Sequence, residues 1–191
     1  MTRKTDSVVY TIGYGSRSIE QFISTLSRYC ILTVVDVRSY PFSRHKPEFS
    51  QPQLAKALEQ SNIRYVPRGR QLGGRPDDPE CYISDRVDYD KYRLKETYRR
   101  GIEQLVKDVR GQSSIVLMCS EAKPEACHRS KLLGVSLQEQ GIQVLHIDEK
   151  GEIKAQGEVA DLLTGKQLGL FGNPTAGLRS RRKYRNGNSE N

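Results

Sequence analysis

The chain has 191 residues, with 31 Lys and Arg against 23 Asp and Glu, so its formal net charge is +8. A chain of this length can bury one full core, and its four cysteines are spaced unlike a disulfide framework. Because residues 1–6 are not followed by a long apolar stretch, we expect a cytoplasmic protein with no signal peptide, no membrane span and reduced thiols.

Strand and helix patterns alternate along the chain. Apolar runs predict strands at 8–13, 31–36, 63–66, 114–118 and 143–147, the last being the final strand. Helical spacing of apolar residues predicts helices at 19–26, 52–58, 89–109 and 130–140. This order predicts a three-layer α/β fold, in which helices flank a mainly parallel sheet. We expect residues 1–163 to form the domain and residues 164–191 to be a flexible basic tail.

Polar and glycine-rich loops follow most of the predicted strands. Right-handed crossovers would bring the carboxyl ends of these strands to one edge of the sheet, where open α/β sheets bind ligands. The loops concerned are 13–16, 36–39, 67–68 and 119–129. The sequence therefore predicts a functional site at this edge.

The loop at 119–129 carries the densest chemistry. Glu121, Cys127 and His128 are its catalytic candidates, and Arg129 is a candidate phosphate ligand. A helix beginning at 130 would favour anions at its start and lower the pKa of the Cys127 thiol, although Cys127 could also be a small buried residue. For Cys119, at a buried strand end, we favour packing. An adjacent Cys–His pair is an awkward chelate, so we expect no metal and no cofactor.

A second group of candidates follows the strand at 31–36. Asp36 can act as a base or orient a sugar hydroxyl, while Arg38, Ser43 and Arg44 can hold phosphate. The alternative for Asp36 is a structural ion pair with Arg38 or Arg44. Tyr14, after the first strand, is a candidate for stacking on a base.

Two glycines and one histidine have more than one interpretation. Gly73 and Gly74 allow a backbone to approach a ligand closely, but a plain tight turn explains them equally well. His146 lies among apolar residues of the last predicted strand, so we expect it to be a core histidine with satisfied hydrogen bonds.

The predicted tail contains one apolar peptide followed by cations. Residues Gln167, Leu168, Leu170 and Phe171 form a segment that resembles the sliding-clamp-binding motif of bacterial DNA polymerases and repair proteins. Such a peptide docks either on a partner's groove or on its own domain. Residues suited to nucleic acid follow it: Arg179, Arg181, Arg182, Lys183 and Arg185.

The ordered motifs at 11–15, 36–44, 72–74 and 119–129 resemble the domain of unknown function 488 (DUF488) family, over about residues 8–150. The resemblance implies a three-layer α/β domain with these motifs around one site, and no particular reaction. A weaker resemblance is to rhodanese-type domains, which share the strand end Asp-Val-Arg and a catalytic cysteine loop. That loop is short in rhodanese-type domains, whereas here Cys119 and Arg129 are ten positions apart.

Three functions remain open on this basis. The first is a DNA- or nucleotide-processing enzyme, a repair-type hydrolase or glycosylase, tethered to the sliding clamp and using Glu121 or Asp36 as its carboxylate base. The second is a rhodanese-like thiol enzyme using Cys127 or Cys119. The third is a non-catalytic adaptor that binds nucleic acid.

Overall fold

A six-stranded sheet forms the centre of the protein, in a computed structural model that describes residues 7–111, 114–164, 177–181 and 183–184. The strand order is β3-β2-β6-β1-β7-β8, with β8 antiparallel to β7 and the other neighbours parallel. The strands are β1 (Val8–Gly13), β2 (Thr33–Asp36), β3 (Arg64–Pro67), β6 (Ile115–Cys119), β7 (Gln143–Ile147) and β8 (Ile153–Ala155). The five predicted strands are confirmed, but β7 is not the last, because a short β8 follows it.

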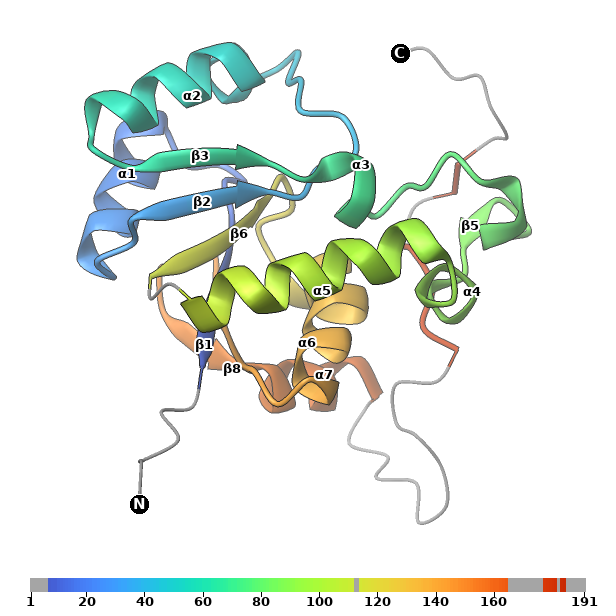
Figure 1. Ribbon diagram of the computed structural model, residues 1–191. Helices are drawn as coiled ribbons and strands as arrows, with labels where there is room; N and C mark the ends of the chain where they lie inside the picture. The colour runs from blue at the N-terminus through green and yellow to red at the C-terminus, as the bar shows by residue number, and fades with distance from the viewer. Residues whose placement is uncertain (1–6, 112–113, 165–176, 182, 185–191) are drawn as a thin grey trace, which may run out of the picture.

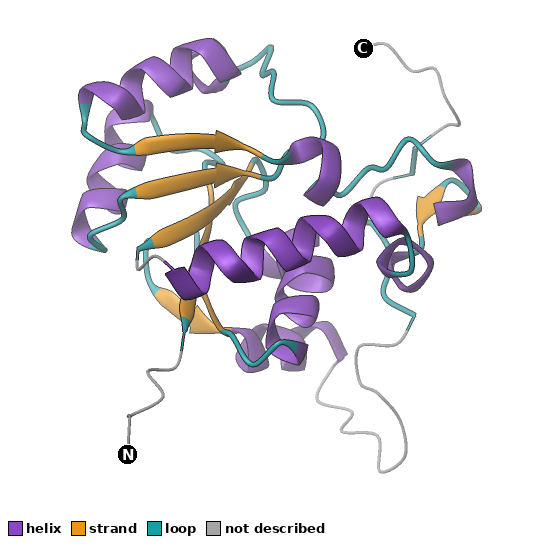
Figure 2. Cartoon of the chain, viewed as in Figure 1, coloured by secondary structure: helices purple, strands orange, loops and turns teal. Residues whose placement is uncertain are grey.

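Helices cover both faces of the sheet (Figures 1 and 2), which confirms the predicted three-layer α/β fold. One face carries α1 (Ile19–Arg28) and α2 (Gln51–Gln60), and the other carries α5 (Glu96–Gly111) and α6 (Val135–Glu139). The residues of β6 alternate between the two layers. Ile115, Leu117 and Cys119 join the core under α5, whereas Val116 and Met118 join the core under α1 and α2. The thiol of Cys119 therefore belongs to the α5 side.

The remaining elements are short or lie at the margins of the sheet. The α-helical ones are α3 (Gly69–Leu72), α4 (Tyr89–Arg93) and α7 (Gln156–Thr164). A hairpin of β4 (Tyr82–Ile83) and β5 (Arg86–Val87) precedes α4. Single turns are η1 (Pro47–Phe49), η2 (Pro79–Cys81) and η3 (Pro124–Ala126), and a wider turn, η4 (Arg129–Gly134), precedes α6. No helix in these described ranges is both long and apolar enough to cross a membrane.

Local sequence signals explain where the main helices begin. Ser18 caps α1 by accepting the backbone N–H of Gln21, whose side chain accepts the backbone N–H of Ser18 in return. Pro52 lies in the first turn of α2, where its missing N–H costs no hydrogen bond. The start of α1 is the predicted one, and α2 begins one residue before the predicted start.

Two predicted helices are divided. The one expected at 89–109 is interrupted after α4, where Leu94 and Lys95 donate to carbonyls three residues back and Lys95 pairs with Asp78 at 2.7 Å. The one expected at 130–140 begins as the π-helical η4 and continues as α6. A side chain at Gly134 would collide with Gln156 of α7, its Cβ lying 2.1 Å from Oε1. The π-helical segment η4 therefore ends at the residue that packs closely against α7.

The described part of the C-terminal segment packs on the domain, although a free tail is expected there. Ser180 is 3% exposed; its backbone N–H donates to the Val87 carbonyl and its Oγ accepts the Val87 N–H, both at 3.0 Å. Leu178 accepts from Tyr89, and both Leu178 and Tyr184 pack on the core under α5. We call residues 177–181 and 183–184 the C-terminal strap. The clamp-like peptide 167–171, Arg182 and Arg185 lie outside the described residues.

Candidate functional site

A cleft of about 550 Å³ lies at the carboxyl ends of β1, β2 and β6. The loops that follow these three strands supply Tyr14, Arg38 and Glu121 to its wall, and the C-terminal strap supplies Arg181. A second cleft of about 480 Å³ lies beside it and shares Arg38. The first cleft thus lies at the edge of the sheet that the sequence predicts.

Two thiols and one imidazole line the first cleft together. Nδ1 of His128 lies 3.6 Å from Sγ of Cys127 and 3.8 Å from Sγ of Cys119. All three residues are buried, with exposed fractions of 5% for Cys119, 1% for Cys127 and 8% for His128. We expected only packing from Cys119, yet its thiol faces the two other candidates.

The backbone explains how adjacent side chains reach the same point. Cys127 is extended (φ −112°, ψ 151°), whereas His128 is helical (φ −63°, ψ −22°). The chain therefore turns between them, and both side chains approach Cys119. The objection that an adjacent Cys–His pair chelates poorly does not hold for this turn.

The two thiols have pKa values displaced in opposite directions. A hydrogen bond from Cys127, assisted by His128, lowers the pKa of Cys119 well below its usual value. Burial and the same hydrogen bond raise the pKa of Cys127. The sequence predicted a lowered pKa for Cys127 at a helix start, but burial outweighs that effect.

Arg129 stabilises the 119–129 loop and is not placed to hold a ligand's phosphate. It is 0% exposed, and its Nη2 donates to the carbonyls of Glu121 at 2.9 Å and Ala122 at 2.7 Å. Gly13 lets β1 approach the Glu121 carbonyl closely, since a Cβ at residue 13 would lie 1.7 Å from that oxygen. Glu121 is half-buried and lines the cleft, and its catalytic role stays a prediction.

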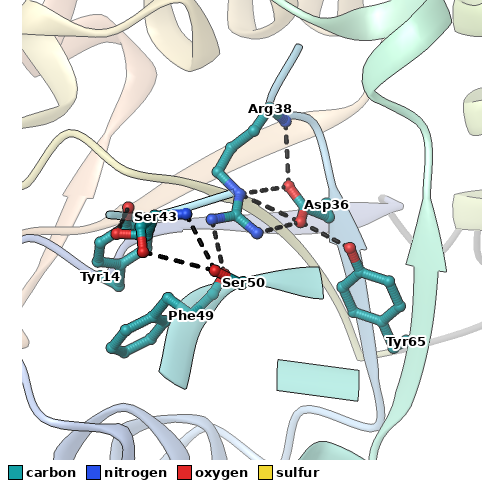
Figure 3. A network of polar contacts seen from close by, with 7 residues as sticks. All are labelled: Tyr14, Asp36, Arg38, Ser43, Phe49, Ser50 and Tyr65. Carbon is teal, nitrogen blue, oxygen red and sulfur yellow. Dashed lines mark hydrogen bonds and ion pairs between the residues drawn. The ribbon is translucent and has the colours of Figure 1, made fainter. Parts of the chain in front are cut away.

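Asp36 and Arg38 form a buried ion pair, which was the alternative interpretation of Asp36 (Figure 3). Nη2 of Arg38 lies 2.6 Å from Oδ2 of Asp36, and Nε lies 2.9 and 3.1 Å from the two carboxylate oxygens. Tyr65 donates to Oδ2 at 2.7 Å. Burial and the neighbouring carboxylate raise the pKa of Tyr65, so its hydroxyl stays a donor. Asp36 lines the second cleft and not the first.

Tyr14 lies in the first cleft with one face already covered. Its ring stacks on Phe49 at 4.2 Å, and the Arg38 guanidinium lies 5.5 Å from its centroid. The Oγ of Ser43 accepts from the backbone N–H of Lys46 in its own loop. It also accepts from the Tyr14 hydroxyl (Figure 3). Neither Ser43 nor the exposed Arg44 lines either cleft.

Gly73 and Gly74 are glycines because other parts of the protein approach them closely. A Cβ at Gly74 would lie 2.6 Å from Cγ of His128, and a Cβ at Gly73 would lie 2.3 Å from Oγ of Ser39. Gly74 lines the first cleft and supports the His128 ring. The pair therefore positions His128 and Ser39 instead of leaving a space for phosphate.

The mouth of the cleft is aromatic and basic. Arg75 lies between two rings, with its guanidinium 5.2 Å from the Tyr40 centroid and 4.8 Å from that of Tyr184. Arg181 lines the same mouth. Burial lowers the pKa of Lys131, and the neighbouring charge of Arg181 contributes to this shift.

Sequence reasoning missed part of this mouth. Tyr40, Arg75 and Tyr184 were not among its candidates, although Arg75 directly follows the Gly-Gly pair, which was the available signal. Of the predicted basic tail, Arg179 pairs with Asp88 at 4.0 Å and Lys183 is exposed.

The fold and the site define a three-layer α/β protein with thiols, an imidazole and arginines in a cleft at the carboxyl edge of its sheet. The model of the family named Domain of unknown function DUF488 matches residues 18–136, and the chain belongs to this family. The match leaves out β1, β7 and the C-terminal strap. A search of curated proteins and a search of solved structures found no match to the chain.

Proposed function

We propose that this protein is an enzyme that processes a nucleotide or nucleic acid, as a repair-type hydrolase or glycosylase. The observation that carries this proposal is the composition of one cleft: Glu121, Cys119, Cys127 and His128 lie in the same cavity as Arg75 with its two tyrosines. Arginine planes and aromatic rings stack on bases, and arginines bind phosphate. A carboxylate beside such a ligand can act as general base.

The exposure of the two groups of residues fits a ligand that enters the cleft base first. Cys119, Cys127 and His128 are nearly buried and Glu121 is half-buried, whereas Tyr40 and Phe42 at the mouth are 58% and 71% exposed. An enzyme that works on a base in a strand must accept that base outside the stack, in a closed pocket. We therefore favour a single extruded or free nucleotide as the reacting group.

Nucleotide binding is tested with fluorescent single-stranded oligonucleotides and a panel of nucleotides. Removing a stack costs about 1–3 kcal/mol per base, so Arg75→Ala should weaken binding by that amount, and Arg181→Ala should also reduce the salt dependence. Arg100→Ala is the control, since Arg100 is an exposed cation of α5 that pairs with Glu96 and lies outside both clefts. Equal affinity of Arg75→Ala and wild type would exclude this cleft as the nucleotide site.

Catalysis by Glu121 is tested separately. Glu121→Gln keeps the size of the side chain but removes the carboxylate, so it should abolish turnover and leave ligand binding intact. Salt-dependent binding to nucleic acid with no turnover on any substrate would favour the non-catalytic adaptor.

The tether to a bacterial-type sliding clamp is a separate part of the proposal. It is supported by the sequence of residues 167–171 alone, which resembles a clamp-binding motif. A pull-down with purified clamp compares wild type with Gln167→Ala/Phe171→Ala. Equal recovery of the clamp by both proteins would remove the tether and leave the enzyme proposal in place.

A thiol enzyme is the second candidate, because Cys119 faces Cys127 and His128 inside the cleft. Here Cys119 would be the nucleophile and His128 its proton acceptor. If Cys119→Ser abolishes turnover while Glu121→Gln spares it, this candidate replaces the hydrolase.

A further inference from the structure

Three side chains at the base of the cleft present the donor set of a transition-metal site. Among the described residues, Cys119, Cys127 and His128 form the one group of this kind, with all their ligand atoms within 4.8 Å of one another. Thiolate sulfur together with imidazole nitrogen is a ligand set typical of zinc. All three residues are buried, so the group is not a chance meeting of exposed surface side chains.

The two sulfur-to-nitrogen distances match two edges of a zinc tetrahedron. Zinc bonds of about 2.3 Å to sulfur and about 2.05 Å to nitrogen place a sulfur and a nitrogen ligand roughly 3.6 Å apart. Nδ1 of His128 lies 3.6 Å from one sulfur and 3.8 Å from the other. The imidazole nitrogen therefore already lies at ligand spacing from both sulfurs, and the two sulfurs lie within 4.8 Å of each other.

The imidazole already has the orientation of a metal ligand. Nε2 of His128 lies 3.1 Å from the Val37 carbonyl oxygen, which can only accept, so Nε2 carries the proton. The lone pair is then on Nδ1, the nitrogen that faces the two thiols. A metal-binding histidine usually donates its other N–H to a backbone carbonyl or a carboxylate in this way.

The rest of the loop holds these ligands in place. Gly74 packs directly on the His128 ring, and Arg129 fixes the carbonyls of Glu121 and Ala122, which follow Cys119 in the chain. Ser130 donates to the carbonyls of Pro124 and Cys127. A site built on such a supported loop binds metal with little reorganisation.

We propose that Cys119, Cys127 and His128 bind one zinc ion whose fourth position faces the cleft. Two thiolates and one Zn²⁺ form a neutral unit, which suits a buried position. Three protein ligands with an open fourth position are the arrangement of catalytic zinc, which lowers the pKa of a bound water to about 7. Glu121 lines the same cleft.

Zinc binding is tested on the full chain, stripped of metal with a chelator under reducing conditions and then supplied with Zn²⁺ alone. Elemental analysis after gel filtration should find one zinc per chain. Co²⁺ in place of zinc should give thiolate-to-cobalt charge-transfer absorption and the intense visible bands of a tetrahedral ion. Cys119→Ser, Cys127→Ser and His128→Gln should each lose stoichiometric zinc. Cys30→Ser should keep it, because Cys30 is an exposed cysteine outside the cleft.

Measurements on the wild-type chain keep the test decisive if a variant does not fold. Zn²⁺ should protect Cys119 and Cys127 from alkylation while Cys30 still reacts, as mapped by peptide mass spectrometry. No zinc retained, or cobalt spectra without charge-transfer bands, would overturn the proposal. The zinc site does not depend on the proposed substrate, since these experiments contain no nucleotide, whereas oligonucleotide binding is measured on metal-free protein. Failure of one proposal therefore leaves the other standing.

Discussion

Replacing Asp36 by Asn keeps the shape of the side chain but removes the only charge that balances Arg38 within the network of Figure 3. The two side chains are 1% and 5% exposed, so water cannot replace the lost carboxylate. Breaking a buried ion pair by removing one partner costs about 3–5 kcal/mol, because the other charge is left in the interior. We expect Asp36→Asn to destabilise the fold by that amount.

This loss is large enough to measure by simple denaturation. For a chain of 150–250 residues, each kcal/mol shifts the melting temperature by about 2–4 °C, so the variant should melt roughly 6–20 °C below wild type. Urea unfolding followed by far-UV circular dichroism gives the free energy of unfolding, with an unchanged slope if both transitions are two-state. Tyr65→Phe removes only one hydrogen bond to the carboxylate and should cost about 1.5–3 kcal/mol.

A double-mutant cycle decides whether the pair causes the loss. Arg38→Met alone also leaves a buried charge, whereas Asp36→Asn/Arg38→Met leaves none. The double variant should therefore lose less stability than the sum of the losses of the two single variants. The control is the exposed pair Glu96–Arg100 of α5, whose side chains are 68% and 73% exposed; Glu96→Gln should cost at most about 0.5 kcal/mol. Strict additivity, or a loss for Asp36→Asn no larger than for Glu96→Gln, would refute this account.

Three further predictions follow from buried contacts. Burial lowers the pKa of His146 from 6.5 to about 4, so the unfolded chain binds a proton that the native state does not, and stability should fall by about 3 kcal/mol between pH 6.5 and pH 4. Urea titrations should show a shallower fall for His146→Gln, and an equal slope would contradict this origin. Gly74→Ala places a Cβ 2.6 Å from Cγ of His128 and should weaken zinc binding about 10–100-fold by calorimetric titration; unchanged affinity would mean that the ring is not held there. Ser180→Ala leaves the buried N–H of Val87 without its acceptor and should cost about 1–3 kcal/mol in thermal unfolding, whereas an unchanged melting temperature would mean that the strap contributes no stability.

The sequence alone was sufficient to predict the main strands of the sheet and the edge of the sheet at which the cleft lies. Buried strands such as β6 are continuous apolar runs, and their carboxyl ends meet because right-handed crossovers leave no other arrangement. His146 is the core histidine that its neighbours predicted, since Thr11 and Gln156 each lie 2.6 Å from one of its ring nitrogens. By contrast, β8 has only three residues and shows no periodicity that could be recognised.

Within the candidate site, sequence reasoning selected a loop that lines the first cleft, but it assigned several residues of that loop to the wrong environment. Arg129 suggested a phosphate ligand, but its Nη2 donates to two carbonyl oxygens, which any sequence supplies. Cys119 suggested packing, because only the turn between Cys127 and His128 brings their side chains back to it. The strap was invisible for a similar reason: Ser180 is held by backbone groups of β5, which no residue pattern announces.

The close approach of β1 to the 119–129 loop has a consequence for evolution within the family. Gly13, the Glu121 carbonyl and Arg129 occupy one point, where a Cβ on residue 13 would lie 1.7 Å from the carbonyl oxygen and 3.1 Å from Nη2 of Arg129. A larger residue at 13 can be accommodated only if the loop moves and the guanidinium loses its acceptors. Across homologous sequences, positions 13 and 129 should therefore change together or not at all, although they are far apart in the sequence.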